Sequence, residues 1–164
     1  MGGGGGTKLY DAVLLASDEL MRKQHGRKAL ILLTDGMDQG SKTPLSEAVE
    51  SAQRADTLVY SILFEDPEMA GGGFRGMGRR DSVDGKQVLE RISRETGGRF
   101  FEVSKKRTIT DVYASIEEDL RNQYSLGYSP DRTGSTGEYH RIHLTAKQKG
   151  YVVQTREGYY QGQS

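Results

Sequence analysis

One short apolar run, Ala29 to Leu33, constrains the fold of this chain more than any other feature. The run is too short for a helix, and its unbroken apolar character is typical of a parallel strand that is covered on both faces. Asp35-Gly36 follows almost at once and supplies a polar side chain and a turn residue. The run therefore predicts a buried strand of an α/β sheet with an aspartate at its carboxyl end.

Helical and strand patterns alternate along the chain up to Asn122. Apolar residues recur at helical spacing on either side of the apolar run, and further short β-rich runs follow. Thr43-Pro44 is predicted to begin one helix, with Pro44 in its first position. This order predicts a Rossmann-like parallel sheet with right-handed crossovers and flanking helices. The predicted helices cover 9–21, 44–55, 85–95 and 109–120, and the predicted strands cover 29–33, 57–64 and 99–103.

The pattern changes after Asn122, where short β-rich runs are separated by turn residues. This change predicts a small antiparallel extension. We therefore expect a partial α/β domain over 1–122 and a C-terminal β extension over 123–164 that packs on the same domain. The predicted strands of the extension cover 124–128, 139–146 and 151–156.

Composition disfavours several classes of function. Lys plus Arg and Asp plus Glu number 23 each, so no overall charge favours a nucleic acid or a membrane surface. The glycine- and arginine-rich segment 65–84 is predicted to be a long loop, with its few arginines offset by neighbouring acids. The absence of cysteine excludes disulfides, thiolate metal sites and cysteine nucleophiles. No apolar run approaches the about 18 residues of a membrane span, and no export signal is visible.

Two oxygen-bearing side chains are predicted to meet at one edge of the sheet. Thr7 stands at the start of an amphipathic helix, and Asp35 follows the buried strand. Ligands of open α/β sheets bind outside the carboxyl ends of the strands, and Mg²⁺, Mn²⁺ and Ca²⁺ all prefer such hydroxyl and carboxylate oxygens. Asp38 and Ser41, in the loop that follows, are secondary candidates through bridging water. The alternative is structural: Thr7 caps the helix, and the aspartates shape a solvated turn.

No residue pattern typical of an enzyme is found. The glycine tract at 2–6 follows no strand and precedes no Gly-Lys-[Ser/Thr], so it is not a phosphate-binding loop. His25, His140 and His143 lack the spacing of metal ligands, and no nucleophile is paired with a base. A nucleotide-dependent enzyme on a Rossmann-like sheet is therefore only a remote alternative.

Several stretches of the chain match the motifs of one known family. Gly5 to Val13 is similar to a loop and helix that supply a threonine, and Leu33 to Gly36 is similar to a strand end that supplies an aspartate. Leu120 to Tyr128 and Arg156 to Tyr160 also stand in the order of that family. The chain resembles a von Willebrand factor type A domain of the bacterial VWFA-related group, whose threonine and aspartate belong to a metal-ion-dependent adhesion site.

The resemblance implies a non-enzymatic module for protein binding and cell adhesion. Mg²⁺ or Mn²⁺, with Ca²⁺ as a further option, would be held by Thr7 directly and by Asp35 directly or through water. A carboxylate of a partner protein would fill the open position on the metal, and the loops 37–43 and 65–84 would select the partner. The family also implies a parent protein that is secreted, periplasmic or on the cell surface.

The chain departs from the family pattern before Thr7. Family members begin with a strand that carries Asp-x-Ser-x-Ser, lies in the middle of the sheet and forms the floor of the metal site. No such strand precedes Thr7, and Asp131 to Ser135, which matches the pattern formally, is predicted to be a hairpin turn. We therefore expect an incomplete site whose metal binding is weak or absent. The alternative function is a self-associating structural fragment, a homo-oligomer formed through 29–33 as an open sheet edge or by exchange of an element.

Overall fold

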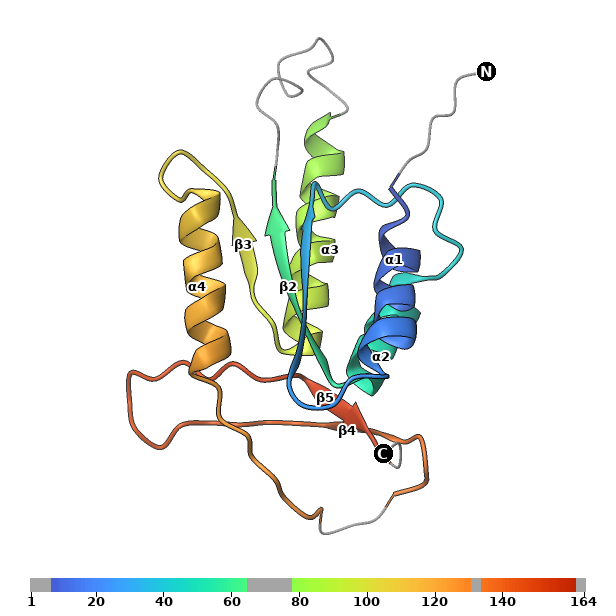
Figure 1. Ribbon diagram of the computed structural model, residues 1–164, viewed down its shortest axis with the longest axis vertical. Coiled ribbons are helices and arrows are strands. Elements are labelled where there is room, and N and C mark those ends of the chain that lie inside the picture. The colour runs from blue at the N-terminus through green and yellow to red at the C-terminus, as the bar shows by residue number, and fades with distance from the viewer. Residues whose placement is uncertain (1–6, 65–77, 131–133, 162–164) are drawn as a thin grey trace.

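The structure is a computed structural model that describes residues 7–64, 78–130 and 134–161, without the side chains of 78–83. Helices and strands alternate through most of it, as Figure 1 shows. The elements are α1 (Leu9–Leu15), the π-helical turn η1 (Ala16–Met21), β1 (Lys28–Thr34), α2 (Leu45–Arg54), β2 (Thr57–Leu63), α3 (Gly78–Thr96), β3 (Phe100–Glu102), α4 (Ile109–Arg121), β4 (Tyr139–Arg141) and β5 (Gly158–Tyr160).

The first three strands form a parallel sheet in the order β1-β2-β3. β1 pairs with β2 from Lys28 opposite Thr57 to Thr34 opposite Leu63, and β3 continues the sheet on the other side of β2. β4 and β5 form a separate antiparallel pair near the C-terminus. The predicted fold class, a parallel α/β sheet with flanking helices and a small antiparallel extension, is therefore confirmed.

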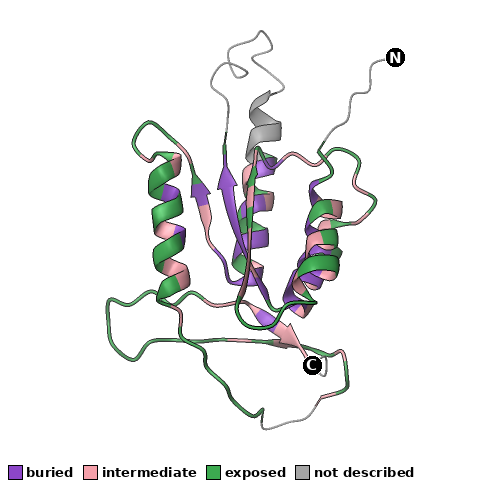
Figure 2. Ribbon diagram, in the orientation of Figure 1, coloured by how far each residue is buried: buried purple, intermediate pink, exposed green. Residues whose placement is uncertain are grey.

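The strand β2 is the centre of the core because it is covered on both faces. Alternate residues of a strand point to opposite faces, and Val59 packs with Ile92 of α3 whereas Ile62 packs with Ile116 of α4. Helices α1 and α2 lie on the α3 side of the sheet, and α4 lies on the other side (Figure 1). Figure 2 shows the buried residues gathered in β2 and on the helix faces turned toward it.

The first strand departs from the prediction. A strand covered on both faces was expected, but Ile31 and Leu33 of β1 are 38% and 52% exposed. The reason is position, since among the described residues β1 stands at the end of the strand order and pairs with β2 alone. An unbroken apolar run indicates a buried strand without revealing on which sides neighbours are present.

Two helix starts also differ from the prediction. α3 begins at Gly78, inside the segment predicted as a loop, while 65–77 lie outside the described residues. Glycine content favoured a loop, but a helix anchored further along by buried Leu89 and Ile92 continues back through this polar stretch. Pro44 has an extended ψ of 154° and is the residue before the helix, so α2 begins at Leu45.

The C-terminal extension (residues 123–164) contains less strand than predicted. β4 and β5 pair with each other, whereas 124–128 and 151–156 form no strand in the described residues. Tyr124 and Val152 are 92% and 96% exposed. High β-propensity produces a strand only where a neighbouring strand accepts its hydrogen bonds, and none lies beside these segments in the described part of the chain.

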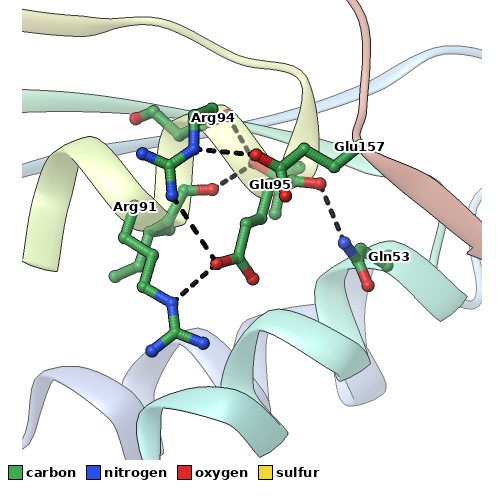
Figure 3. A network of polar contacts seen from close by, with 8 residues as sticks. Gln53, Arg91, Arg94, Glu95 and Glu157 are labelled. Atoms are coloured by element: carbon green, nitrogen blue, oxygen red, sulfur yellow. Dashed lines mark hydrogen bonds and ion pairs between the residues drawn. The ribbon is translucent and has the colours of Figure 1, made fainter. Parts of the chain in front are cut away.

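Polar contacts anchor the extension to α3 and join α3 to α2, as Figure 3 shows. Arg94 Nε of α3 donates to Glu157 Oε1 at 2.8 Å, and the Glu157 N–H donates to the Glu95 carbonyl at 3.4 Å. The same carbonyl accepts from Gln53 Nε2 of α2 at 2.8 Å, and Arg91 pairs with the Glu95 carboxylate at 2.6 Å. One helix end thus joins three segments that lie far apart in the sequence.

No helix in the described part of the chain has the length and apolar character that crossing a membrane requires.

The turn from α3 to β3 lies against the backbone of β2. Thr96 Oγ1 accepts from the Val59 N–H at 3.1 Å and donates to the Ile92 carbonyl at 2.8 Å. A Cβ at Gly98 would overlap the Val59 carbonyl, so only glycine permits this approach. This contact sets how closely α3 and β3 lie against the central strand.

We expect Gly98→Ala to lower the free energy of unfolding by about 2–3 kcal/mol, because the new methyl group meets rigid backbone. Gly127→Ala is the matched control, since a Cβ there has no neighbour within 4 Å, and its effect should stay within about 0.5 kcal/mol. Urea unfolding followed by circular dichroism measures both. Equal stability of the two variants would contradict this account of the turn.

Candidate functional site

The fold brings Thr7 and Asp35 to the same end of the sheet. Asp35 follows β1 directly and is exposed, and Thr7 is an exposed residue two positions before α1. The Thr7 carbonyl accepts from the Gln39 N–H at 2.8 Å, so the start of α1 lies against the loop that follows Asp35. We call residues 35–43 the site loop. The carboxyl end of β1 and the start of α1 therefore form one surface.

A glycine pair holds the beginning of the site loop against α3. Gly36 has φ +80°, a conformation that favours glycine, and a Cβ there would overlap the backbone of Gly85. A Cβ at Gly85 would in turn approach the Asp35 carbonyl to 2.6 Å. The backbone at Asp35 is thus packed directly on α3, and this contact fixes the position of the Asp35 Cα, from which its side chain extends.

The Asp35 carboxylate is oriented by its own turn. Its Oδ1 accepts from the Met37 N–H at 3.0 Å and from the Thr34 hydroxyl at 3.3 Å. The Thr34 hydroxyl also accepts from the Gly36 N–H at 3.2 Å. Both of these contacts to the carboxylate use Oδ1, and no contact to Oδ2 is found within the described residues.

Asp38 and Ser41 accept hydrogen bonds from backbone amides at the start of α1. Asp38 Oδ1 accepts from the Tyr10 N–H at 3.2 Å and from the Ser41 hydroxyl at 2.5 Å, and Asp38 Oδ2 accepts from the Ser41 N–H at 3.2 Å. The Ser41 hydroxyl accepts from the Asp11 N–H at 3.2 Å. Since Lys8 at the N-cap position contributes no side-chain bond, Asp38 and Ser41 satisfy amides at the helix start from outside the helix.

The pKa of Asp38 is lowered from its ordinary value of 3.8. Burial acts to raise it, but the hydrogen bonds from Ser41 and from the backbone of Tyr10 favour the charged form and prevail. A negative charge beside the first turn of a helix also interacts favourably with the helix dipole. These contacts give Asp38 a structural role at the start of α1, beyond the solvated turn that was predicted as the alternative.

Asp11 is a residue of this surface that the sequence reasoning missed. Its Oδ1 accepts from the Lys42 N–H at 3.0 Å and from the Thr43 N–H at 2.9 Å. Hydrogen bonds, the one from the Thr43 backbone foremost, lower the pKa of Asp11 from its ordinary 3.8. An acidic residue in the first turn of a predicted helix indicates a favourable interaction with the helix N-terminus. The sequence does not indicate that the Lys42 and Thr43 amides would bind it.

Helix and loop therefore hold each other through two carboxylates. Asp38 of the site loop receives an amide of α1, and Asp11 of α1 receives two amides of the site loop. Thr7 and Asp35 flank this double contact at the two ends where helix and loop begin. Any ligand at this edge consequently meets a surface whose backbone is already ordered.

The donors at this surface suit a hard cation but are few. In the described part of the chain no group of three or more His, Cys, Asp or Glu residues could hold a metal ion. The Thr7 hydroxyl and Asp35 Oδ2 are oxygen ligands of the kind that Mg²⁺ and Ca²⁺ take. Residues 131–133 lie outside the described residues, so the hairpin turn expected at Asp131 to Ser135 stays a prediction.

We expect Asp38→Asn to lower the free energy of unfolding at pH 7 by about 1 kcal/mol, because a charged acceptor is lost at a helix start. The folded pKa is depressed, so this stabilisation is present above the unfolded pKa near 3.8 and is lost as pH falls through the lower folded value. The curves of wild type and variant should converge below pH 3.8.

The matched control is Asp84→Asn, which changes an exposed aspartate of α3. Urea titrations of the three proteins between pH 7 and pH 3 provide the comparison. A difference between wild type and Asp38→Asn that does not change with pH would show that the charge of Asp38 is not what stabilises the helix start.

Comparison with known proteins finds one family whose model matches the chain. The model of the von Willebrand factor type A domain matches residues 1–115, which is more than half of the chain and includes both Thr7 and Asp35. No curated protein and no solved structure matches the chain. By the extent of the match, together with its parallel sheet, the chain belongs to the von Willebrand factor type A family.

Proposed function

We propose that this chain is a non-enzymatic protein-binding module in which Thr7 and Asp35 contribute to a metal-ion-dependent adhesion site. The observation that supports the proposal is the hydrogen bond from the Gln39 N–H to the Thr7 carbonyl, which holds the start of α1 against the loop that follows Asp35. Family membership supports the same function, since von Willebrand factor type A domains are typically involved in protein binding. The proposal assigns this role to residues 1–122, with the C-terminal extension packed on them.

The residues of the site have separate tasks in this proposal. Thr7 offers a hydroxyl oxygen from the start of α1, and Asp35 offers Oδ2, whose direction is set by the bonds that Oδ1 makes within the turn. Gly36 and Gly85 keep the turn against α3, so the carboxylate needs little reorganisation to meet a cation. A bound Mg²⁺ or Mn²⁺ would supply positive charge for a carboxylate of a partner protein.

The small number of ligands predicts weak binding. Two protein oxygens leave a divalent cation in need of about four more, from water, from a partner or from another strand. Asp38 and Ser41 are already hydrogen-bonded to the start of α1, so direct ligation by them would cost those bonds. The site loop, with exposed Gln39 and Lys42 beside Asp35, is the surface that a partner protein would contact.

We expect calorimetric titration with Mn²⁺ and with Mg²⁺ to give weak saturable binding, with a dissociation constant on the order of 10⁻³ M. Asp35→Asn should abolish it, because the amide can keep the turn through its oxygen but lacks the charge that the cation needs. The matched control is Asp56→Asn, at an exposed aspartate whose side chain pairs with Arg156 away from the site.

Unchanged binding in Asp35→Asn, or loss of binding in Asp56→Asn as well, would contradict the assignment of Asp35. Wild-type protein without saturable binding would overturn the metal-dependent part of the proposal. Circular dichroism of each variant separates loss of binding from loss of fold.

A further inference from the structure

A polar pocket lies where the C-terminal extension meets α2 and α3. It has a volume of about 320 Å³, and its walls come from these two helices, from β4 and from residues 157–160. Arg156 of the extension pairs with Asp56, the residue directly before β2, so this junction lies at the amino end of the sheet. The site loop lies at the opposite end (Figure 1), and neither Thr7 nor Asp35 lines the pocket.

Each element turns one face toward the pocket. The α2 wall is formed within 46–53 by side chains that recur at helical spacing, and α3 contributes Arg91 and Glu95, which are one turn apart. β4 contributes Tyr139 and Arg141, which share one face of the strand because they are two residues apart. The pocket is therefore a product of how the extension packs on the helices, and no single segment contains it.

The negative charges in the walls are already balanced. Three glutamates line the pocket, and each is paired with an arginine of a helix: Glu50 with Arg54 at 2.7 Å, Glu95 with Arg91 at 2.6 Å and Glu157 with Arg94 at 2.8 Å. Figure 3 shows the last two of these pairs side by side. Carboxylates held in this way are poor ligands for a cation, in agreement with the absence of a metal-binding group in the described part of the chain.

The guanidinium of Arg141 is the positive charge that remains. Neither an ion pair nor a hydrogen bond of its side chain is found among the described residues, although it lines the same pocket. A guanidinium binds a carboxylate through two parallel N–H···O bonds. A phosphate dianion would need a second unpaired cation, and the described walls contain none. One unbalanced positive charge therefore favours a ligand with one carboxylate.

Apolar surface lies beside this charge. The rings of Tyr139 and Tyr160 are 5.0 Å apart between centroids, and buried Val49 of α2 also lines the pocket. Gly158 permits the arrangement, since a Cβ there would overlap the Tyr139 ring. Burial foremost, and then the Glu50 carboxylate, raise the pKa of Tyr160 above its ordinary 10.0, so its hydroxyl stays neutral at pH 7. The rings form an uncharged shelf for an apolar group.

We propose that this pocket binds a monocarboxylate with an apolar or aromatic body. Arg141 donates two hydrogen bonds to the carboxylate, and the body lies against the rings of Tyr139 and Tyr160. The volume is at the lower end of the range of about 300 to 1,000 Å³ that ligand pockets occupy, so the ligand is small. The C-terminal residue of a peptide and a free aromatic acid share this chemistry. The proposed metal site shares no residue with the pocket.

The first test is titration of the ¹⁵N-labelled full chain, followed by NMR, with N-acetyl-L-phenylalanine and with phenylacetate. We expect saturable binding with a dissociation constant on the order of 10⁻³ M and shifts of the amide signals of 139–141 and 157–160. N-acetyl-L-phenylalanine amide is the matched neutral ligand and should bind at least about 10-fold more weakly. Tighter binding of N-acetyl-L-phenylalanine than of phenylacetate assigns the pocket to a peptide terminus, and the reverse order assigns it to a free acid.

The second test changes the guanidinium. Arg141→Gln should weaken binding of both acids at least about 10-fold, because the charged donor is lost. Arg141→Lys should lose less, about 3-fold, since it keeps the charge without the paired donors. The matched control is Arg121→Gln on α4, whose exposed guanidinium pairs with Glu117 on the other side of the sheet and whose loss should leave binding unchanged.

Failure of this proposal and failure of the metal site are separate results. Asp35→Asn, which tests the metal site, should bind N-acetyl-L-phenylalanine as the wild-type chain does. The proposal would be overturned by no saturation with either acid, by equal binding of the amide, or by unchanged binding in Arg141→Gln. Shifts confined to residues away from the pocket would also overturn it. Circular dichroism of each variant confirms that the fold is retained.

Discussion

Burial of β2 on both faces is the constraint on which the rest of the structure depends. One face of this strand packs on α3 and the other on α4, and its two edges carry β1 and β3. Parallel pairing provides no short turn between neighbours, so each connection needs a crossover that a helix supplies. Once β2 is central, β1 ends at the same edge as β2, and the site loop must leave from that edge.

The site follows from this arrangement through close backbone contacts rather than through a dense set of side chains. Glycine at 36 and 85 lets the loop after β1 lie on α3, and the exchanged contacts of Asp11 and Asp38 join that loop to α1. Most of the charged oxygen atoms at this edge therefore stabilise protein backbone. In the proposed function Thr7 and Asp35 are the donors for an external ligand, which is why we expect binding to depend on groups that a partner or another strand supplies.

The amino-acid sequence by itself determined the fold class and the place of the candidate site. Apolar runs of strand length that alternate with helical stripes require a parallel sheet, and a carboxylate just after such a run must emerge at its carboxyl edge. These patterns are local, so they can be read without knowledge of the neighbours. The resemblance to the family came from the same stretches, around Thr7 and Asp35.

Only the tertiary structure decided what surrounds each segment. The run 29–33 is open on one side because no described strand pairs there, and 151–156 stays unpaired despite its β-branched residues. Asp38 caps a helix 28 positions away in the chain, and Asp11 binds amides of a loop that no local pattern associates with it. Such contacts depend on distances between segments that are remote in sequence, and residue spacing along the chain carries no information about those distances.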